Sequence, residues 1–466
     1  MATPNYKVVL IATLLLAPSS CGSDESPGSG SAGSGSGGAA GSGAASGAAG
    51  SGAAGAGATA GAAGSGGTAG AAGTGGTAGS VSGCQPKSGG WKTDLAVYPV
   101  PTSPPQLATA GESIVDPSFG TTLVRLTDAA DGPNCTTAYS YWPTFSSTSS
   151  HGLFSCDAGA VVFDLDWKTG KVSNKRALFA KPTPQGSTPG WEDAIWSDLS
   201  PTQVFAHDGR RLYAYDVVGE QYTLVKDFEP IVGTGWVGQM SKSADDDVFA
   251  FTQKAANYDA VGAIAYRRKD DQVLLTESLP GLDEVQIDKT GGYLVVKTGK
   301  QGAGQIEVKV INVQTKASED LTDDGPDFAP GHSDNGMGTV VGADNWNNRI
   351  TVRKLASPHQ HSAVLDLGQD WAQDYHVSAL ARDESRVLIS LYQSAAHADG
   401  LFHSEIIQVA TDGSQAVRRL AHHHSVYGNY FDSPRANISR DGCFVAFTST
   451  WGQSGRRDVF MLDLSK

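Results

Sequence analysis

Short apolar stretches alternate with polar turns from residue 141 to the end of the chain. No long stretch has the 3.6-residue apolar period of a helix. One unit recurs: a short strand, a polar turn, two apolar strands and a final amphipathic strand. The second strands recur roughly every 45 to 55 residues, as GLFSC, QVFAH, DVFAF, GYLVV, TVVGA, RVLIS and CFVAF. Four-stranded repeats of about this length are typical of propeller blades, so the pattern predicts an all-β fold, a seven-bladed β-propeller.

The third strands repeat with the same spacing, and they show how the ring closes. They read AVVFDLDW, RLYAYDVV, VGAIAYRR, IEVKVINV, RITVRKL, SEIIQVAT and DVFMLDL. The seventh unit has no fourth strand after DVFMLDL (458–464). Segment 121–129 (TTLVRLTDA) resembles the outer strands and has no blade of its own. We therefore expect it to pair with 458–464 and complete the last blade.

Four cysteines lie between residue 84 and the end of the sequence, and an even number in an exported protein indicates two disulfides. Cys84 lies upstream of the closing strand and Cys443 in the blade that it completes, so this pair would staple the ring. Cys135 and Cys156 flank the first inner strands and form the other natural pair. Four cysteines allow three pairings, and four buried thiols are the alternative.

The first 20 residues have the layout of a secretory signal peptide, with Lys7 followed by an apolar run at 8–17 and by Pro18, Ser19 and Ser20. The run is too short to span a bilayer. Cys21 occupies the position of the acceptor cysteine in a bacterial lipoprotein signal. We expect lipid attachment there and anchoring to the cell envelope, at the outer membrane. Cleavage that releases a soluble secreted protein is the alternative.

Composition divides the rest of the chain. Residues 21–83 are almost entirely Gly, Ala, Ser and Thr, which predicts a disordered tether. Residues 84–120 are expected to form an N-terminal extension packed on the propeller, and 121–466 the propeller itself. The formal charge of −14 argues against nucleic acid as a partner. We expect a monomer that contacts the membrane only through its lipid.

The segments YSYWPTFS, AHHHSVYGNYFDSPRANISRDGCFVAFTSTWG and DVFMLDL carry a family resemblance. The chain from about residue 120 onward resembles the TolB-like and oligogalacturonate lyase-like seven-bladed propellers. The resemblance implies the fold, and for the lyases a metal held by a His-Pro-His pair in a late blade. Here the matching stretch reads Ser433-Pro434-Arg435, so two expected ligands are absent.

Propeller ligands usually bind at the channel mouth, where the loops into the innermost strands meet. These loops contain more polar and aromatic residues than the packing of the blades requires. The predicted ligand-binding residues are Trp142, Trp191, Asp193, Trp236, Asp334, His422 and His424. Imidazoles from separate blades could hold a divalent metal (Mn, Zn or Ca), for which His332, His376 and His424 are the candidates. The alternatives are structural hydrogen bonds for His332 and a polar surface loop for 422–424.

A catalytic alternative needs no metal. β-Elimination from a uronic-acid polymer requires a base, a cation that stabilises the enolate and an acid for the leaving oxygen. His332 or His376 could be the base, Arg435 the cation, and Tyr141 or Tyr430 the acid. The sequence therefore predicts a surface lipoprotein whose propeller binds an extracellular ligand, a carbohydrate or peptide. A polysaccharide lyase and a TolB-like scaffold for envelope proteins are the alternatives.

Overall fold

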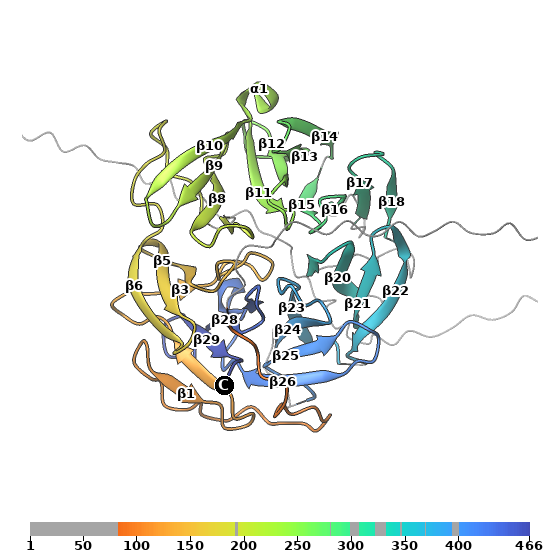
Figure 1. The fold of residues 1–466 in the computed structure, drawn as a ribbon. Coiled ribbons are helices and arrows are strands. Elements are labelled where there is room, and N and C mark those ends of the chain that lie inside the picture. Colours follow the sequence, from red (N-terminus) through yellow and green to blue (C-terminus); the bar gives the residue numbers. More distant parts are fainter. Residues whose placement is uncertain are drawn as a thin grey trace, which may run out of the picture. The chain divides into compact units, whose positions relative to one another are not determined.

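Seven antiparallel sheets stand around a central axis in the computed structural model of the chain (Figure 1). The structure describes residues 83–191, 194–279, 281–298, 307–321, 332–344, 347–368, 370–393 and 400–466. The seven-bladed β-propeller predicted from the repeats is confirmed. The signal peptide, the lipidation site at Cys21 and the tether up to residue 82 lie outside the described residues.

Blades 1 to 3 each have four strands, and the first strand of each is the innermost. Blade 1 contains β3 (Cys135–Thr136), β4 (His151–Cys156), β5 (Gly159–Asp166) and β6 (Lys171–Ala177). Blade 2 contains β7 (Ile195–Trp196), β8 (Gln203–His207), β9 (Arg211–Asp216) and β10 (Gln221–Asp227). A short helix α1 (Glu229–Val232) leads into blade 3, which contains β11 (Trp236–Lys242), β12 (Val248–Lys254), β13 (Ala260–Arg267) and β14 (Gln272–Ser278).

Blades 4 to 6 repeat this order. Blade 4 contains β15 (Leu282–Ile287), β16 (Tyr293–Thr298), β17 (Glu307–Asn312) and β18 (Ser318–Asp320). Blade 5 contains β19 (Ser333–Asn335), β20 (Thr339–Asp344), β21 (Arg349–Lys354) and β22 (Ser357–Asp366). Blade 6 contains β23 (Gln373–Ser378), β24 (Arg386–Gln393), β25 (Glu405–Ala410) and β26 (Val417–His422).

Blade 7 is assembled from both ends of the propeller. A 3-10 turn η1 (Tyr430–Asp432) precedes its strands β27 (Asn437–Ile438), β28 (Phe444–Ser449) and β29 (Asp458–Asp463). The fourth strand is β2 (Thr122–Arg125), which pairs with β29 through Leu123 opposite Leu462 and Val124 opposite Met461. The predicted closure is confirmed. A fifth strand that we did not expect, β1 (Ser113–Val115), pairs with β2 at the outer edge.

The core lies in the seams between blades. The buried apolar side chains of the described residues fall into seven clusters, one for each pair of neighbouring blades. The middle strands β28 and β29 are buried at every position, whereas the outer strand β6 (KVSNKRA) is mostly exposed. Strands buried on both faces need continuous β-branched and aromatic residues, which explains why the second and third strands were the clearest sequence signals.

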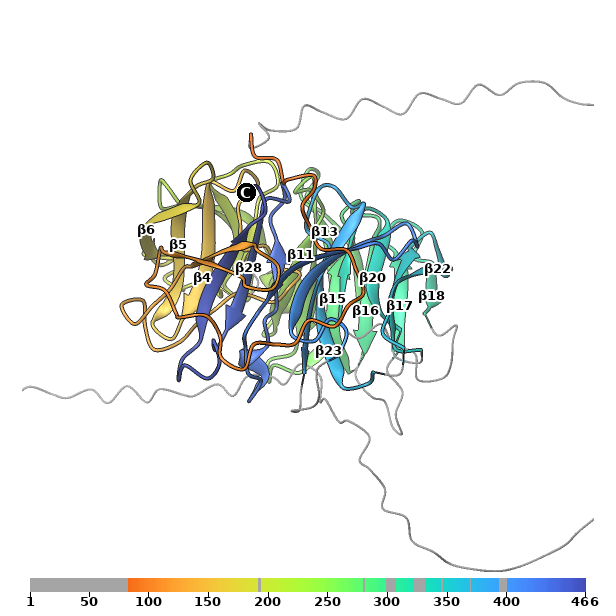
Figure 2. The ribbon, with the colours of Figure 1, turned by 90° about the horizontal axis from the view of Figure 1, so that it is seen from below.

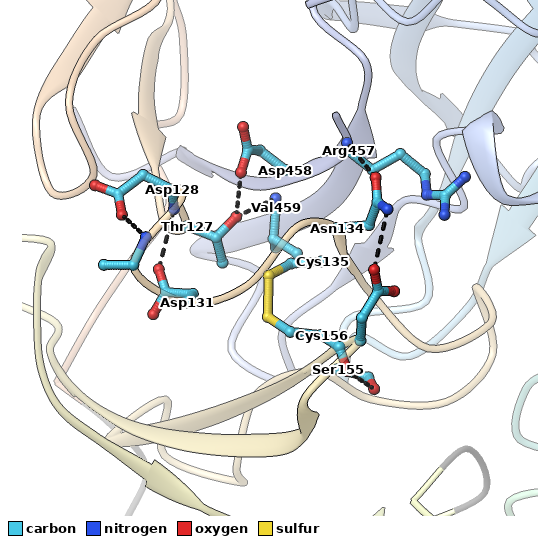
Figure 3. The surroundings of a disulfide bond; sticks show 12 residues. Thr127, Asp128, Asp131, Asn134, Cys135, Ser155, Cys156, Arg457, Asp458 and Val459 are labelled. Atoms are coloured by element: carbon cyan, nitrogen blue, oxygen red, sulfur yellow. Dashed lines mark hydrogen bonds between the residues drawn. A yellow bond between two sulfur atoms is a disulfide. The ribbon is translucent and has the colours of Figure 1, made fainter. Parts of the chain in front are cut away.

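Hydrogen bonds and a disulfide fasten the junction where blade 7 meets blade 1 (Figure 3). Thr127 Oγ1 donates to Asp458 (2.8 Å) and accepts from the Val459 amide (3.0 Å). The Cys135 amide donates to the Arg457 carbonyl (2.9 Å), and Cys135 is linked to Cys156 on the neighbouring strand. The second disulfide joins Cys84 to Cys443. Both predicted pairings are confirmed.

Residues 83–120 run along the edge of blades 6 and 7 (Figure 2). The Lys87 amide donates to the Leu464 carbonyl (2.8 Å), and Trp451 Nε1 donates to the Pro105 carbonyl (2.8 Å). Arg419 is fully buried between Glu405 and this segment, where its Nη1 donates to the Ala96 carbonyl. No helix among the described residues is long and apolar enough to span a bilayer.

The direction of the strands defines two faces. All innermost strands run the same way, so the residues that precede β19, β23 and β27 gather on one face, which we call the mouth face. The turns that follow these strands, such as Gly336–Gly338 and Ala379–Ser385, gather on the opposite base face.

Candidate functional site

Side chains from four blades meet at the mouth face. We call Tyr139 of blade 1, His332 of blade 5, His376 of blade 6 and Arg435 of blade 7 the mouth cluster. The rings of His332 and His376 stack with centroids 4.4 Å apart and planes tilted by 15°. Tyr139 meets both imidazoles edge-on, at 5.0 Å from His376 and 6.1 Å from His332. The structure thus brings together three residues that the sequence predicted as catalytic: His332, His376 and Arg435.

His376 is fully buried, and neither of its ring nitrogens has a hydrogen-bond partner among the described residues. Its ring stacks on Tyr392 of the neighbouring strand β24 (5.2 Å). Burial lowers the pKa of His376 well below its ordinary value, and the charges of His332 and Arg435 lower it further. The ring is therefore neutral at pH 7. A neutral imidazole without a partner can take a proton or accept a hydrogen bond from a ligand.

Arg435 brings a buried positive charge to the same place. Its side chain is 2% exposed, and its Nε and Nη2 have no partner among the described residues. The guanidinium lies over the rings of Tyr430 (5.3 Å) and Phe431 (5.6 Å). Its backbone φ of +41° is strained for a non-glycine residue. A buried, incompletely paired cation is costly unless an anion completes its hydrogen bonds.

His332 is held in place by polar contacts that the neighbouring His376 lacks among the described residues. Its Nδ1 donates to the Tyr375 carbonyl (2.6 Å) and lies 3.4 Å from the Asp374 carboxylate. Asp374 also accepts from the Tyr392 hydroxyl (2.8 Å). Burial alone would raise the pKa of Asp374, but the charge and hydrogen bond of His332, together with His376 and Tyr392, lower it below the ordinary value. The predicted structural hydrogen bonds of His332 are therefore present, and this residue positions His376.

A small cavity of about 40 Å³ lies in the channel, lined by residues that include Tyr141, Trp142, Lys289, Asp334 and Arg440. Asp334 accepts hydrogen bonds from the amides of Asn335 (2.7 Å) and Ala379 (2.6 Å). Its burial raises the pKa of this carboxyl to about 7. The cavity has room for one or two water molecules.

Ion pairs between blades lie at the base-face end of the innermost strands. Asp198 binds Lys242 Nζ (2.6 Å) and Arg440 Nε (2.5 Å), and Lys242 also binds Asp246 (2.5 Å). Lys289 Nζ binds Glu384 (2.6 Å). These side chains join blades 2, 3, 4, 6 and 7, so a ligand of the channel is expected to enter from the mouth face.

Replacing Asp334 by Asn is expected to change how stability depends on pH. In the unfolded chain this carboxyl ionises near pH 4, but in the folded protein it ionises near pH 7. The folded state therefore binds more protons between these values, and the contribution of Asp334 to stability falls as the pH rises from 4 to 7. Because the cavity admits water, we expect only part of the full effect. The unfolding free-energy difference between wild type and Asp334→Asn should shift by about 1 to 2 kcal/mol in favour of the variant from pH 5 to pH 8.

Urea unfolding at a series of pH values measures this difference. Asp344→Asn is the matched control. Hydrogen bonds from Asn347 and the nearby Arg349 lower the pKa of Asp344, against the effect of its burial. Its difference from wild type should stay constant from pH 5 to pH 8. A constant difference for Asp334→Asn as well would contradict the raised pKa.

The other predicted residues divide between the channel and the blade seams. Tyr141 packs against Tyr139 (4.6 Å), and Tyr430 lies against Arg435 (5.3 Å). Trp142 is buried and donates its Nε1 to the Met240 carbonyl (2.9 Å). It belongs to the apolar cluster between blades 2 and 3, and Trp191 packs against that cluster. Trp236 lies between blades 2 and 3, where it stacks on Tyr258 (5.4 Å) and under Arg210 (4.6 Å). Asp193 lies outside the described residues.

The histidine run lies elsewhere than expected. His422 is the last residue of the outer strand β26, and its Nε2 bonds the Tyr98 carbonyl (3.2 Å). His424 lies beside Asp116 (3.9 Å) and Trp451 (4.7 Å), and burial lowers its pKa to about 4. Both histidines thus hold the N-terminal extension. Their prediction as channel-mouth residues is wrong, because the run follows an outer strand, far from the axis.

The predicted metal centre at His332, His376 and His424 does not assemble. Among the described residues, no group of three or more His, Cys, Asp or Glu side chains could hold a metal ion. Arg435 occupies the stretch where the resemblance implied metal-binding histidines, and its positive charge already acts on His376. A guanidinium beside two stacked imidazoles repels a metal ion, so these residues do not fit Mn, Zn or Ca.

Two residues of this site were missed from the sequence. Asp374 fixes His332 and lies two residues before His376, so strand alternation places both on the same side of β23. That spacing could have identified it. Tyr392 stacks on His376 from the neighbouring strand β24, a contact that only the strand register reveals.

Comparison with known proteins adds the fold and no more. No protein-family model and no curated protein matches the chain. An oligogalacturonate lyase from Vibrio parahaemolyticus matches 76% of this chain and 96% of its own, with TM-score 0.57 and 12% identity. An oligogalacturonate lyase in complex with manganese matches 78% of this chain and 98% of its own, with TM-score 0.55 and 14% identity. Both share the propeller fold.

Proposed function

We propose that this propeller binds an acidic saccharide at the mouth of its channel, with Arg435 receiving the carboxylate of the sugar. The observation that carries the proposal is a pair of buried side chains, Arg435 and His376. Among the described residues, Nε and Nη2 of Arg435 and both ring nitrogens of His376 lack hydrogen-bond partners. Such groups in a native structure need an explanation, and a bound ligand supplies one. A carboxylate would pair with the guanidinium, and a hydroxyl could donate to the imidazole.

The surroundings favour a sugar over other acids. Aromatic rings of Tyr139, Tyr141 and Tyr430 lie around the two polar groups and offer faces for the apolar side of a pyranose ring. The cations that line the channel below are already paired with carboxylates. The positive charge at the mouth therefore comes from Arg435, although the whole chain is acidic. A buried local charge can attract a short acidic ligand where the overall charge disfavours a long polyanion. The fold likeness to two oligogalacturonate lyases supports the same substrate class.

Binding of trigalacturonate provides the test. We expect the wild type to bind it measurably by titration calorimetry, more weakly as salt increases, and at least tenfold more tightly than Arg435→Gln does. A charge-assisted bond to a buried cation contributes about 1.5 to 3 kcal/mol. Arg457→Gln is the matched control, because Arg457 also lies over Phe431 (5.6 Å) but pairs with Asp432 (3.2 Å). Equal affinity in all three proteins, or no binding to the wild type, would refute the proposal and leave the scaffold alternative.

We also propose that the protein acts outside the cytoplasm, anchored through Cys21. Two disulfides support this, because they persist in oxidising compartments. An extracellular or envelope glycan is then the partner. Mass spectrometry of the N-terminus should find a lipid on Cys21 that is lost in Cys21→Ser, and an unmodified N-terminus would refute anchoring.

Cleavage of the bound saccharide by β-elimination is the second candidate. It is favoured by His376, which is neutral, without a partner among the described residues, and beside Arg435. The imidazole would take the proton next to the carboxylate, and the electron pair would pass to the carboxylate as an enolate beside Arg435. Collapse of the enolate forms the double bond and expels the glycosidic oxygen, which takes a proton from Tyr141 or Tyr430.

A further inference from the structure

A second cavity, of about 400 Å³, lies between blades 5 and 6 at their base-face ends. We call it the blade 5–6 pocket. Its lining includes Arg353, Lys354, Glu384 and Arg386. Cavities of about 300 to 1,000 Å³ are typical of small-molecule sites.

Positive charge exceeds negative charge in this lining. The Arg353 side chain is 1% exposed, and its Nη1 donates to the Pro358 carbonyl (3.2 Å). Burial lowers the pKa of Arg386, and the neighbouring Arg418 lowers it further, against the opposite effect of Asp412 and Asp383. A partly buried guanidinium beside a second one is stabilised by an anion.

The one carboxylate of the lining is already engaged. Glu384 binds Lys289 Nζ (2.6 Å) and accepts from the Met337 amide (2.9 Å). Its charge is therefore balanced from the channel side, by a lysine that does not line this pocket. The cations of the lining that can receive an anion are Lys354 and Arg386.

The rest of the lining fits a polyhydroxylated molecule. Val341, Val352 and Val387 supply an apolar wall, while Thr339, Gln360, Ser362 and Thr411 supply hydroxyl and amide groups. Thr411 Oγ1 donates to the Glu384 carbonyl (2.6 Å), which leaves its lone pairs to accept a ligand hydroxyl. Cations, apolar surface and hydrogen-bonding groups together match a sugar acid.

This pocket is separate from the mouth cluster. Gly336 and Glu384 follow β19 and β23, whereas His332 and Asp374 stand at the beginning of the same strands. A strand of six residues such as β23 is about 20 Å long. The two sites therefore open on opposite faces.

We infer that the blade 5–6 pocket is a second binding site, for a small sugar acid of the hexuronate class. The carboxylate pairs with Arg386 and Lys354 above the buried Arg353, and the ring lies against the three valines. The inference does not rest on the proposed function of the mouth cluster, which uses other residues.

The test measures D-galacturonate binding by saturation-transfer NMR and calorimetry in the Arg435→Gln variant, so that the mouth cluster is excluded. We expect binding at least tenfold tighter than that of neutral D-galactose, and at least a fivefold loss in Arg386→Gln and in Lys354→Gln. Arg418→Gln is the matched control, because Arg418 acts on Arg386 without lining the pocket. It should retain at least half of the affinity.

Two results would overturn the inference. One is binding of galacturonate no tighter than that of galactose. The other is an equal loss in Arg386→Gln and Arg418→Gln, which would indicate attraction by surface charge without a built site. Circular dichroism of each variant checks that it is folded. Arg386 is half-buried and Lys354 is exposed, so their replacement leaves the apolar seam intact.

Discussion

Removing the Cys84–Cys443 disulfide, which we call the staple, is expected to lower the stability of the propeller more than removing the other disulfide. The staple joins the N-terminal extension to blade 7. The Cys84→Ala/Cys443→Ala variant should lose about 3 to 5 kcal/mol of unfolding free energy, a fall of about 4 to 6 °C in Tm for a domain of this size. The reason is that this bridge joins residues 359 positions apart. It therefore restricts the unfolded chain far more than a short loop does.

The loss should appear first where the ring closes. Hydrogen exchange of the β1 and β2 amides, at Ser113–Val115 and Thr122–Arg125, should become faster, because these strands lie between Cys84 and the rest of the ring. Cys135→Ala/Cys156→Ala is the matched control. Its bridge spans only 21 positions and should contribute about 3 kcal/mol, with no selective effect on β1 and β2. Equal losses and uniform exchange in both variants would contradict a closing role for the staple.

The sequence was sufficient for the fold because its signals are local. Second and third strands such as β28 and β29 are buried at every position, so they stand out as apolar runs at a regular spacing. The closing strand β2 could be identified from a missing partner and a matching pattern. The fifth strand β1 could not. It has three residues, of which only Ile114 is buried, and only its pairing with β2 reveals it.

The site was predicted in part for the same reason. His332 and Arg435 precede innermost strands and His376 lies in one, so the ring topology alone brings them toward the axis. The positions of His422 and His424 depended on the extension, which covers β26 through Tyr98 and Asp116. No local pattern indicates where such an extension packs. The sequence also cannot show which side chains are hydrogen-bonded. The bond that holds His332, and the lack of a partner for His376 among the described residues, depend on side-chain positions in three dimensions.

The substitution that best separates catalysis from structure is His376→Phe. Phenylalanine keeps a flat ring between His332 and Tyr392 and removes only the two nitrogens. Because those nitrogens have no partner among the described residues, removing them eliminates a desolvation cost without breaking a hydrogen bond. The variant should therefore be at least as stable as the wild type. His332→Phe is the control. It loses the bond to the Tyr375 carbonyl and should cost about 1 to 3 kcal/mol.

If the protein cleaves acidic saccharides, His376→Phe should slow the release of unsaturated products from polygalacturonate by about 100- to 10,000-fold. The binding of trigalacturonate should weaken by no more than about tenfold, because the variant loses one neutral hydrogen bond while Arg435 still receives the carboxylate and the base acts mainly in the transition state. Ultraviolet absorbance of the unsaturated products measures the rate, and calorimetry measures the affinity. A stable His376→Phe variant with undiminished cleavage would remove His376 as the base. A wild type that binds trigalacturonate but releases no unsaturated product would exclude elimination and leave binding as the function of the mouth cluster.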